Sequence, residues 1–295
     1  MIQHLNTTPA NPKRVVILGS GGFIGSQLME RLKKEKIPVM GVRSSEINLI
    51  EENSVEKLAG LLQKDDAVVF ASALTPDKGK DAATMMKNLR MAMHVAAAIE
   101  KAPCAHLIYI SSDAMFAEDT PPITESMPAG AGNLYGWMHV GRELIMDEAA
   151  KKIKMPYLII RPCPVYGAGD THNGYGPNRF IRTSLQEKKI KLFGEGEEQR
   201  PHVYIDDVIA ILFYALRKRT AGLIHAVPAP SVSFHKMAEM IAQLTNNGTV
   251  IEGSPRANPV THKHFDHSNL LKAFPEISLT PLEKGLEITV KKMAK

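Results

Sequence analysis

Serine, tyrosine and histidine residues are spaced in this sequence so that they could move a proton. Ser111 and Ser112 directly follow the apolar run His106–Ile110, and Tyr135 begins a helical pattern in which His139 comes one turn later. If the apolar run is a strand, the hydroxyl of Ser112 lies at its carboxyl end. The field at a helix start and a nearby cation can lower the pKa of a phenol, which makes Tyr135 a candidate proton donor and acceptor. We therefore expect acid–base chemistry there.

Three glycines near the amino end indicate a second site. Gly19, Gly22 and Gly25 follow the strand-like run Val15–Leu18 and lead into a helical pattern over Ser26–Lys34. Because glycine has no side chain, a pyrophosphate could approach the backbone N–H groups at the positive start of that helix. Glycines also occur in tight turns that bind nothing, but the strand before them and the helix after them favour a bound dinucleotide.

The elements that would position these residues alternate between strand and helix. The pattern predicts further strands at Val39–Val42, Ala67–Ala71, His106–Ile110 and Tyr157–Arg161, and helices at Ser54–Leu62, at Ala82–Lys101 and from about Tyr135 to Lys152. This alternation is typical of an α/β protein with a Rossmann-type, doubly wound parallel sheet. Ligands of such sheets bind at the carboxyl ends of the strands, where both candidate sites would lie.

The composition changes after Gly167. Residues 168–200 are rich in Gly, Asn, Asp and Arg, and the segment from about 222 mixes short extended runs with helices near Ser233–Thr245 and His267–Ala273. We predict a dinucleotide-binding domain of residues 13–167 plus 201–221 and a smaller, interleaved C-terminal substrate lobe of residues 168–200 plus 222–295. Residues 1–12 are mostly polar and contain two prolines, so we expect a flexible tail.

The composition also excludes several functional classes. The 295 residues are 44% hydrophobic and 23% charged, with a net charge of +5, which is ordinary for a globular protein. The apolar runs are shorter than the ~20 residues of a membrane span, and the basic residues are scattered. Cys104 and Cys163 indicate neither a zinc site nor a disulfide framework, and we favour no metal role for His262, His264 and His267. We expect a cytoplasmic protein with no metal, nucleic-acid or membrane partner.

Five motifs, in order, make the sequence similar to a known family. They are the glycine triplet, Ser111-Ser112 after the fourth strand, Tyr135-Gly136 at a helix start, the run from Arg161 to Gly167, and the run from Arg200 to Val208. From about residue 13 to 290 the chain resembles the extended short-chain dehydrogenase/reductase family. Within that family it resembles the NAD(P)-dependent nucleotide-sugar epimerases, dehydratases and reductases.

The resemblance implies roles for individual residues. Ser112 would hold the reacting oxygen of the substrate, Tyr135 would be the acid and base, and His139 would occupy the position of a lysine. The residues expected at the cofactor are Gly19, Gly22, Phe23, Ile24, Gly25, Arg43, Asn48, Leu49, Ala71, Asn88, Tyr135, His139 and Pro162. The residues expected at the substrate are Ser112, Asp113, Asn173, Arg179 and Arg200. Arg200 would grip a diphosphate, which suits a planar, charged guanidinium.

Two positions depart from the family pattern. Tyr-x-x-x-Lys reads Tyr135-Gly136-Trp137-Met138-His139 here, and a histidine is shorter than a lysine and often neutral at pH 7. His139 would be a weaker substitute for the lysine or a second proton relay. Dehydratase relatives have Asp-Glu where this chain has Asp113-Ala114, which disfavours full dehydration. The fucose-synthase branch has a cysteine in place of Ala114, so epimerisation at two centres is disfavoured as well.

The residues after the second predicted strand bear on the choice of cofactor. An acidic residue there would indicate NAD, but the chain reads Val42-Arg43-Ser44-Ser45, and Arg43 could pair with the 2′-phosphate of NADP. The segment from Arg43 to Leu49 also resembles the NADPH-using fucose-synthase branch, in which Asn48 and Leu49 would lie near the adenine. We therefore predict NADP, with NAD as the alternative.

Together these features predict an NAD(P)-dependent oxidoreductase or epimerase of a nucleotide-diphosphate sugar. Hydride transfer would occur at C4, in a 4-keto reduction or a 4-epimerisation. One alternative is a non-catalytic dinucleotide-binding sensor or scaffold that has lost the active-site lysine. Another is a reductase of a small carbonyl or steroid substrate, although Arg200 argues against a neutral substrate. The resemblance also implies a homodimer through the helix over Ala82–Lys101 and the helix after Tyr135.

Overall fold

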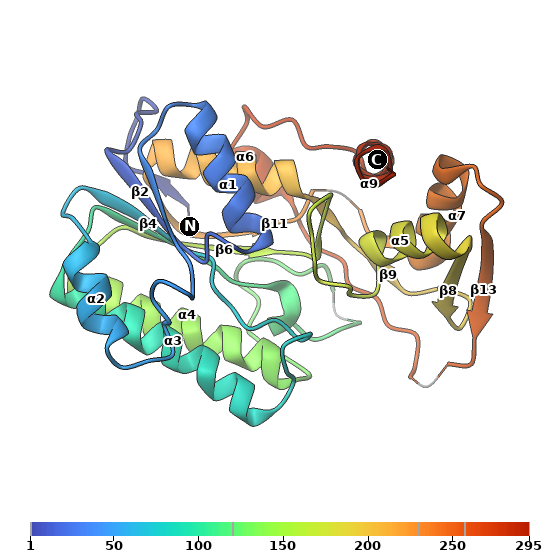
Figure 1. Ribbon diagram of the computed structural model, residues 1–295, viewed down its shortest axis with the longest axis horizontal. Helices are drawn as coiled ribbons and strands as arrows, with labels where there is room; N and C mark the ends of the chain where they lie inside the picture. The colour runs from blue at the N-terminus through green and yellow to red at the C-terminus, as the bar shows by residue number, and fades with distance from the viewer. Residues whose placement is uncertain (1, 120, 229, 257, 295) are drawn as a thin grey trace.

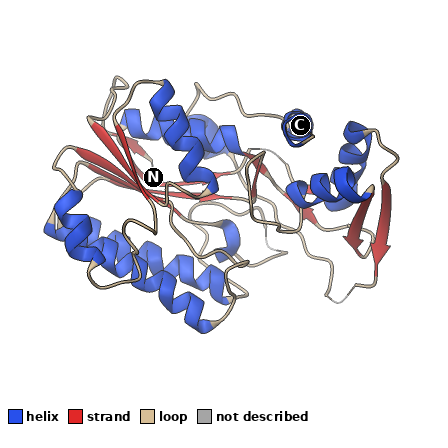
Figure 2. Cartoon of the chain, viewed as in Figure 1, coloured by secondary structure: helices blue, strands red, loops and turns tan. Residues whose placement is uncertain are grey.

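A seven-stranded sheet forms the centre of the larger domain in the part of the chain that the computed structural model describes, residues 2–119, 121–228, 230–256 and 258–294 (Figure 2). Its order is β1-β11-β6-β5-β4-β2-β3. The strands are β1 (Gln3–His4), β2 (Arg14–Leu18), β3 (Val39–Val42), β4 (Asp66–Phe70), β5 (His106–Ile110), β6 (Tyr157–Pro162) and β11 (Thr220–Ala226). Every neighbouring pair is parallel except β1 with β11. The predicted doubly wound α/β sheet is therefore confirmed.

Helices cover both faces of this sheet. On one face lie α1 (Phe23–Lys34) and α6 (Ile205–Lys218), and on the other lie α2 (Ser54–Leu61), α3 (Ala82–Lys101) and α4 (Leu134–Lys152) (Figure 1). Because both faces are covered, the central strands are continuous apolar runs with no polar alternation. The α1 helix begins three residues before the predicted Ser26, since its first turn starts inside the glycine motif.

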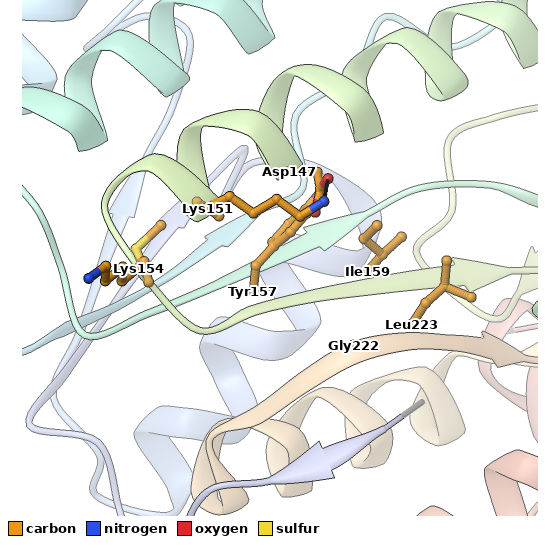
Figure 3. A pocket seen from close by; sticks show the side chains of 9 residues that line it. Asp147, Lys151, Lys154, Tyr157, Ile159, Gly222 and Leu223 are labelled. Carbon is orange, nitrogen blue, oxygen red and sulfur yellow. Dashed lines mark hydrogen bonds and ion pairs between the residues drawn. The ribbon is translucent and has the colours of Figure 1, made fainter.

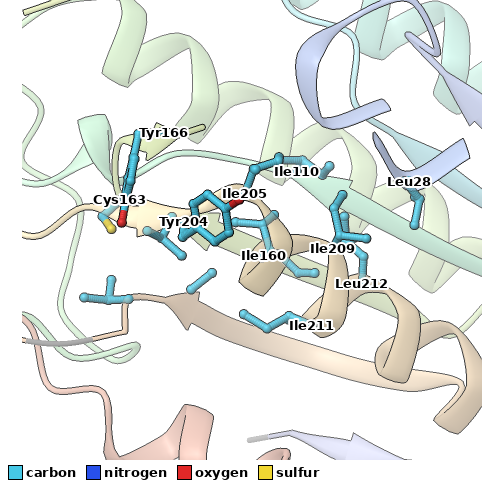
Figure 4. Packing of buried hydrophobic residues seen from close by; sticks show 14 of the residues in the cluster. Leu28, Ile110, Ile160, Cys163, Tyr166, Tyr204, Ile205, Ile209, Ile211 and Leu212 are labelled. Carbon is cyan, nitrogen blue, oxygen red and sulfur yellow. The ribbon is translucent and has the colours of Figure 1, made fainter. Parts of the chain in front are cut away.

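The core between α6 and the sheet consists of aliphatic side chains. Ile209 and Leu212 of α6 lie beside Ile110 at the end of β5 and Ile160 of β6 (Figure 4). Burying each such side chain stabilises the fold by about 1.5–3 kcal/mol. This packing fixes the carboxyl ends of β5 and β6, which is where the candidate catalytic residues begin.

The remaining elements are short and mostly gather at the other end of the molecule, where α5, α7, β8 and β13 lie together (Figure 1). The strands are β7 (Val165–Tyr166), β8 (Lys189–Phe193), β9 (Gln199–Arg200), β10 (Val203–Tyr204), β12 (Val232–Ser233) and β13 (Val250–Ser254). The helices are α5 (Pro177–Glu187), α7 (Phe234–Thr245), α8 (Ser268–Ala273) and α9 (Leu282–Met293), with a 3₁₀ turn, η1, at Asp113–Met115. The division at residues 168–200 and 222–295 stays a prediction.

The expectation of a flexible tail over residues 1–12 is wrong for the described residues. Gln3 and His4 pair with β11, and His4 also lies 2.9 Å from the Thr220 hydroxyl through Nδ1 and 2.8 Å from the Ala273 carbonyl through Nε2. Further along, the N–H of Ala10 donates to the carbonyl of Arg217. The segment covers the edge strand of the sheet, whose backbone groups would otherwise be unpaired. Polar composition alone does not reveal this pairing.

Candidate active site

The glycine motif forms a backbone cradle at the start of α1. Gly19 has φ +93°, and a Cβ there would lie 2.7 Å from the Ser72 hydroxyl. A Cβ on Gly25 would overlap the carbonyl oxygen of Gly19. Gly22 caps α1 without any side-chain hydrogen bond, so the first N–H groups of the helix are free to meet an anion. The residues present therefore fit the pyrophosphate of a dinucleotide.

A cavity of about 420 Å³ extends from this cradle. Its lining includes the predicted cofactor residues Gly19, Gly22, Arg43, Asn48, Leu49 and Ala71. The structure thus brings together residues from the ends of β2, β3 and β4, as expected for the carboxyl edge of a parallel sheet. Phe23, Ile24 and Gly25 form the first turn of α1 beside it. Pro162, the last residue of β6, is outside the lining of this cavity.

Asn88 contributes to this cavity indirectly, by holding the backbone of Leu74. Its side chain is buried in α3, where Oδ1 accepts from the N–H of Leu74 at 2.8 Å and Nδ2 donates to the carbonyl of Leu74 at 3.0 Å. Leu74 lines the cavity in the segment after β4. Asn88 therefore fixes the wall of the cavity.

Arg43 is exposed at the rim of the same cavity. The stem of its side chain lies over the glycine loop, because a Cβ on Gly21 would come 3.7 Å from Arg43 Cγ. The Arg43 guanidinium has no ion pair with any residue that the structure describes. The backbone N–H of Arg43 donates to the Glu46 carboxylate at 2.8 Å. The cationic end of Arg43 is thus available to an anionic ligand.

A second cavity, of about 640 Å³, lies beyond the carboxyl ends of β5 and β6. Asp113, Asn133, Arg200 and Lys263 are among its lining residues. Ser112 stands at its edge as the N-cap of η1, where its Oγ accepts from the N–H of Ala114 at 3.1 Å. This arrangement puts a hydroxyl, a carboxylate and two cations at one end of the sheet.

Tyr135 is held beside η1 by the start of α4. The Asn133 side chain caps this helix by accepting from the N–H of Gly136 at 2.9 Å, and Gly136 packs so closely on the Ala114 carbonyl that a Cβ would overlap it. Burial raises the pKa of Tyr135 to about 12, Asp113 adds to the increase, and Arg142 opposes it. The expectation that the helix start lowers this pKa is therefore wrong, because burial outweighs the helix field.

His139 lies one turn further along α4 and is buried. Its Nδ1 is 2.7 Å from the hydroxyl of Tyr109 on β5, and its ring meets the Tyr135 ring edge-on with centroids 4.8 Å apart. Nε2 is buried without a hydrogen-bond partner among the described residues. Burial and the charge of Arg142 hold the pKa of His139 well below its usual value. The imidazole is neutral at pH 7 and cannot replace the charge of a lysine.

Arg142 is a site residue that the sequence did not reveal. It is fully buried on α4, seven residues after Tyr135 and three after His139, so the three residues share one face of the helix. Its Nη2 donates to the carbonyl of Ser72 at 2.7 Å. The guanidinium lies over the Phe70 ring, 4.3 Å from its centroid. The spacing of 135, 139 and 142 was the available signal, but an arginine in a helix usually faces solvent.

Lys263 is the other residue that sequence reasoning missed. It is buried, and its Nζ donates to the Asp113 backbone carbonyl at 2.9 Å and lies 3.6 Å from the Asp113 carboxylate. Burial raises the pKa of Asp113, while Lys263 and Arg200 act in the opposite direction. Lys263 comes from a segment with no recognisable motif, so only the fold brings it to the cavity.

Arg200 lines the larger cavity, as predicted for a substrate residue, and already has partners there. Its Nη2 lies 2.9 Å from a Glu118 carboxylate oxygen and donates to the Thr261 hydroxyl at 2.8 Å. Asn173 and Arg179 are exposed and are outside the lining of this cavity. Asn173 instead accepts from Arg182 at 3.1 Å.

A third cavity, of about 510 Å³, lies between the last turns of α4 and strands β6 and β11 (Figure 3). Lys151 pairs with Asp147 on the same helix at 2.6 Å, and Tyr157 and Leu223 line the cavity from β6 and β11. Tyr157 begins β6, so this cavity lies at the amino end of the strand. None of the candidate catalytic residues lines it. Because ligands of parallel sheets bind at the carboxyl ends, we do not assign the chemistry to it.

The described residues provide neither a membrane-spanning helix nor a metal-binding group. Among them, no helix combines the length and the apolar character that crossing a membrane requires. They also contain no group of three or more His, Cys, Asp or Glu side chains that could hold a metal ion.

The sequence model of the NAD dependent epimerase/dehydratase family matches residues 15–226. The chain is 24% identical over 278 residues to UDP-N-acetyl-alpha-D-glucosaminuronate decarboxylase of Bacillus cytotoxicus, covering 82% of this chain and 84% of the relative. UDP-glucose 4-epimerase of Thermus thermophilus in complex with NAD has a similar structure, with a TM-score of 0.82, 17% identity and coverage of 95% and 98%. A GDP-L-fucose synthetase of Naegleria fowleri bound to NADP gives a TM-score of 0.85, 16% identity and coverage of 99% and 96%. At these identities the structural likenesses show the fold alone.

Proposed function

The chain belongs to the NAD dependent epimerase/dehydratase family, and on that premise we propose that it is an NADP-dependent oxidoreductase or epimerase of a nucleotide-diphosphate sugar. The observation that supports this best is the position of Tyr135. Tyr135 is outside the lining of both cavities, but the N-cap of its helix, Asn133, is in the lining of the larger cavity, and Arg142 of the same helix contacts Ser72, in the lining of the cofactor cavity. These contacts of α4 support a role for Tyr135 between a substrate and a cofactor.

The smaller cavity would bind the cofactor, and the larger cavity would bind the substrate. A bound nicotinamide would supply or accept the hydride. Gly19, Gly22 and the start of α1 would hold the pyrophosphate, and Asn48 and Leu49 would contact the adenosine. Arg43, whose guanidinium has no carboxylate partner in the part of the chain that the structure describes, would bind the 2′-phosphate, which favours NADP over NAD.

We assign proton transfer to the phenolic oxygen of Tyr135. With a pKa of about 12 the phenol is protonated at pH 7, so it suits donation of a proton to a carbonyl oxygen in a 4-keto reduction. Ser112 would orient that oxygen once its hydroxyl turns from the N–H of Ala114 to the substrate. In a 4-epimerisation, the same groups would first accept the proton of the C4 hydroxyl and then return a proton to the 4-keto oxygen.

Two cations in the larger cavity support a substrate that carries a diphosphate. Arg200 and Lys263 both line the cavity, and each has a carboxylate neighbour in the free protein. A neutral carbonyl compound or steroid would leave both cations without a new partner. We also propose a cytoplasmic homodimer that acts in carbohydrate biosynthesis. The two buried free thiols support a reducing compartment.

A ligand panel tests this function. Thermal unfolding is measured with NAD, NADP and a set of UDP-, GDP- and dTDP-sugars, because a ligand that binds only the folded state raises Tm. We expect NADP and at least one nucleotide sugar to raise Tm, and Arg43→Gln to lower the NADP affinity about tenfold with little effect on NAD. A NADP response without any nucleotide-sugar response or turnover would favour the non-catalytic sensor. No dinucleotide response would contradict the proposal.

A further inference from the structure

Arg142 is a buried charge without a role in the hydride and proton transfers proposed above. It is 0% exposed and forms no ion pair with a carboxylate in the described part of the chain. Its polar contacts are neutral, namely the Ser72 carbonyl at 2.7 Å and the Asn88 amide oxygen at 3.5 Å, and its Nε has no hydrogen-bond partner among the described residues. Burying a charge without a counter-ion is costly, and guanidinium stays protonated in proteins.

The surroundings of this guanidinium include phenols that could carry a negative charge. Burial lowers the pKa of Arg142, and the charges of Tyr109, Tyr135 and Tyr157, when ionised, act in the opposite direction. The Tyr109 ring is also close, since the Arg142 guanidinium carbon lies 5.1 Å from the centroid of that ring. A phenol next to a buried cation is easier to ionise. Arg142 therefore has charge partners only when a tyrosine gives up its proton.

Tyr135 is the phenol whose ionisation matters for the proposed chemistry. Asp113 from η1 and Asp77 from the segment after β4 oppose its ionisation, as does burial. The neighbours on α4 and β5 are His139, which is neutral, and Tyr109. Among the groups that affect the Tyr135 pKa, Arg142 is the one that lowers it.

We propose that Arg142 supplies the positive charge beside Tyr135, in place of the lysine that the family pattern puts at position 139. This inference rests on the proposed function, because it gives that charge a task in proton transfer. It also accounts for His139, since a lysine there would bring a second buried cation onto the face of α4 that already carries Arg142. Through the Ser72 carbonyl, Arg142 also contacts the wall of the cofactor cavity.

A purely structural role makes a different prediction. If Arg142 only fills space over Phe70 and holds Ser72, its removal will change stability and leave the ionisation of Tyr135 unaltered. An activity assay alone cannot separate the two roles, so the ionisation of the phenol has to be observed directly.

The experiment follows ¹³Cζ-labelled tyrosine by NMR against pH, with the Tyr135 signal assigned by its loss in Tyr135→Phe. Spectra of the wild type, Arg142→Met and the double variant His139→Lys/Arg142→Met are recorded with and without NADP⁺, over the pH range in which circular dichroism shows an intact fold. We expect Arg142→Met to move the Tyr135 titration upward by about one pH unit or more, which is a tenfold lower phenolate fraction at a given pH. The double variant should restore most of the shift, because it returns a cation to position 139.

Arg31→Met is the matched control. This arginine also lies over an aromatic ring, 4.6 Å from the centroid of Phe213, but it is on α1 and pairs with Glu35. It should leave the Tyr135 titration unchanged. An equal titration of Tyr135 in the wild type and in folded Arg142→Met would overturn the proposal, and so would a double variant that titrates like Arg142→Met.

The NMR result also separates this inference from the proposed function. The phenol signal needs no substrate, so a chain that turns over no nucleotide sugar can still show the Arg142 effect. Conversely, turnover with an unshifted Tyr135 titration would support the function and reject the role of Arg142. Where a substrate is found, Arg142→Lys should keep more of kcat than Arg142→Met, because it preserves the charge with a shorter stem.

Discussion

Arg200 is bound to a carboxylate in the free protein, with Glu118 Oε1 2.9 Å from Nη2. The Thr261 carbonyl, 2.7 Å from Nη1, holds the other side of the guanidinium. A diphosphate that binds Arg200 must therefore compete with Glu118, which is half-exposed and can swing away into solvent. The guanidinium lies at the cavity wall.

Substitutions of Arg200 and Glu118 should change the affinity for the nucleotide sugar in opposite directions. Arg200→Met should weaken nucleotide-sugar binding by about 10- to 100-fold, since a charge-assisted pair of hydrogen bonds contributes about 1.5–3 kcal/mol. Glu118→Gln should strengthen binding several-fold, because the competing charge is removed. Calorimetric titration measures both, and NADP affinity, which serves as the control, should not change. Equal sugar affinity in Arg200→Met and the wild type would remove Arg200 from the substrate site.

The residues that the sequence identified carry local motifs, and those that it missed do not. Ser112, Tyr135 and Arg200 stand next to strand ends or helix starts that short patterns mark. Neither Arg142 nor Lys263 lies in such a pattern. Arg142 reaches the site because α4 packs beside Ser72, and Lys263 reaches it because a late segment packs on η1. The pKa of Tyr135 was predicted in the wrong direction because burial depends on the whole fold.

At the scale of elements, α1 and the glycine loop meet at a very short distance. A Cβ on Gly25 would overlap the Gly19 carbonyl, so the helix can begin against the loop only because residue 25 lacks a side chain. Gly60 on α2 is different, since a Cβ there has nothing within 4 Å. Both glycines lie in helices, so a comparison of alanine substitutions at the two positions separates the effect of close packing from that of helix propensity.

Alanine at these two positions should have opposite effects. We expect Gly25→Ala to destabilise the fold by about 1–3 kcal/mol through overpacking and to weaken NADP binding. Gly60→Ala should stabilise it by about 0.5–1 kcal/mol, because alanine loses less backbone entropy in a helix. Urea unfolding followed by circular dichroism measures both changes. A neutral Gly25→Ala would show that the loop can move away and that close packing does not determine its shape.

The long elements were predictable because their helices have clear helical periodicity and their strands are continuous apolar runs. The predicted limits of Ala82–Lys101, Val39–Val42 and His106–Ile110 coincide with α3, β3 and β5. The short strands of the second part of the chain were not predicted one by one, since two-residue strands such as β9 and β12 form only by pairing with each other. For the same reason the sequence of β1 does not indicate a strand, since its two residues form one only by pairing with β11.

At the scale of the whole molecule, α3 and α4 lie side by side on the outside of the sheet (Figure 1). Large apolar side chains on both helices are exposed, at Met86 and Met93 on α3 and at Trp137 and Leu144 on α4. Each pair is seven residues apart, so it lies along one face of its helix. These positions agree with the proposed homodimer, in which both helices would be covered.

Leu144→Glu tests the homodimer. Leu144 is 66% exposed, so a charge there costs little in the monomer but is unfavourable in a buried interface. Sedimentation equilibrium should show a dimer for the wild type and a monomer for the variant. Phe193→Glu places the same charge at an exposed apolar residue of the other lobe and should remain a dimer. A monomeric wild type, or an unaffected Leu144→Glu, would contradict this interface.

The most direct measurement of the whole proposal is isotope transfer to the sugar. Each member of a panel of 4-keto nucleotide sugars is incubated with the protein and NADPH deuterated at the transferring carbon, and the product is examined by mass spectrometry and NMR. We predict deuterium at C4 of at least one sugar, and no product with Tyr135→Phe, which should still bind NADP as the wild type does. Absence of deuterium at C4 across the panel, or the same product yield from Tyr135→Phe, would contradict the account.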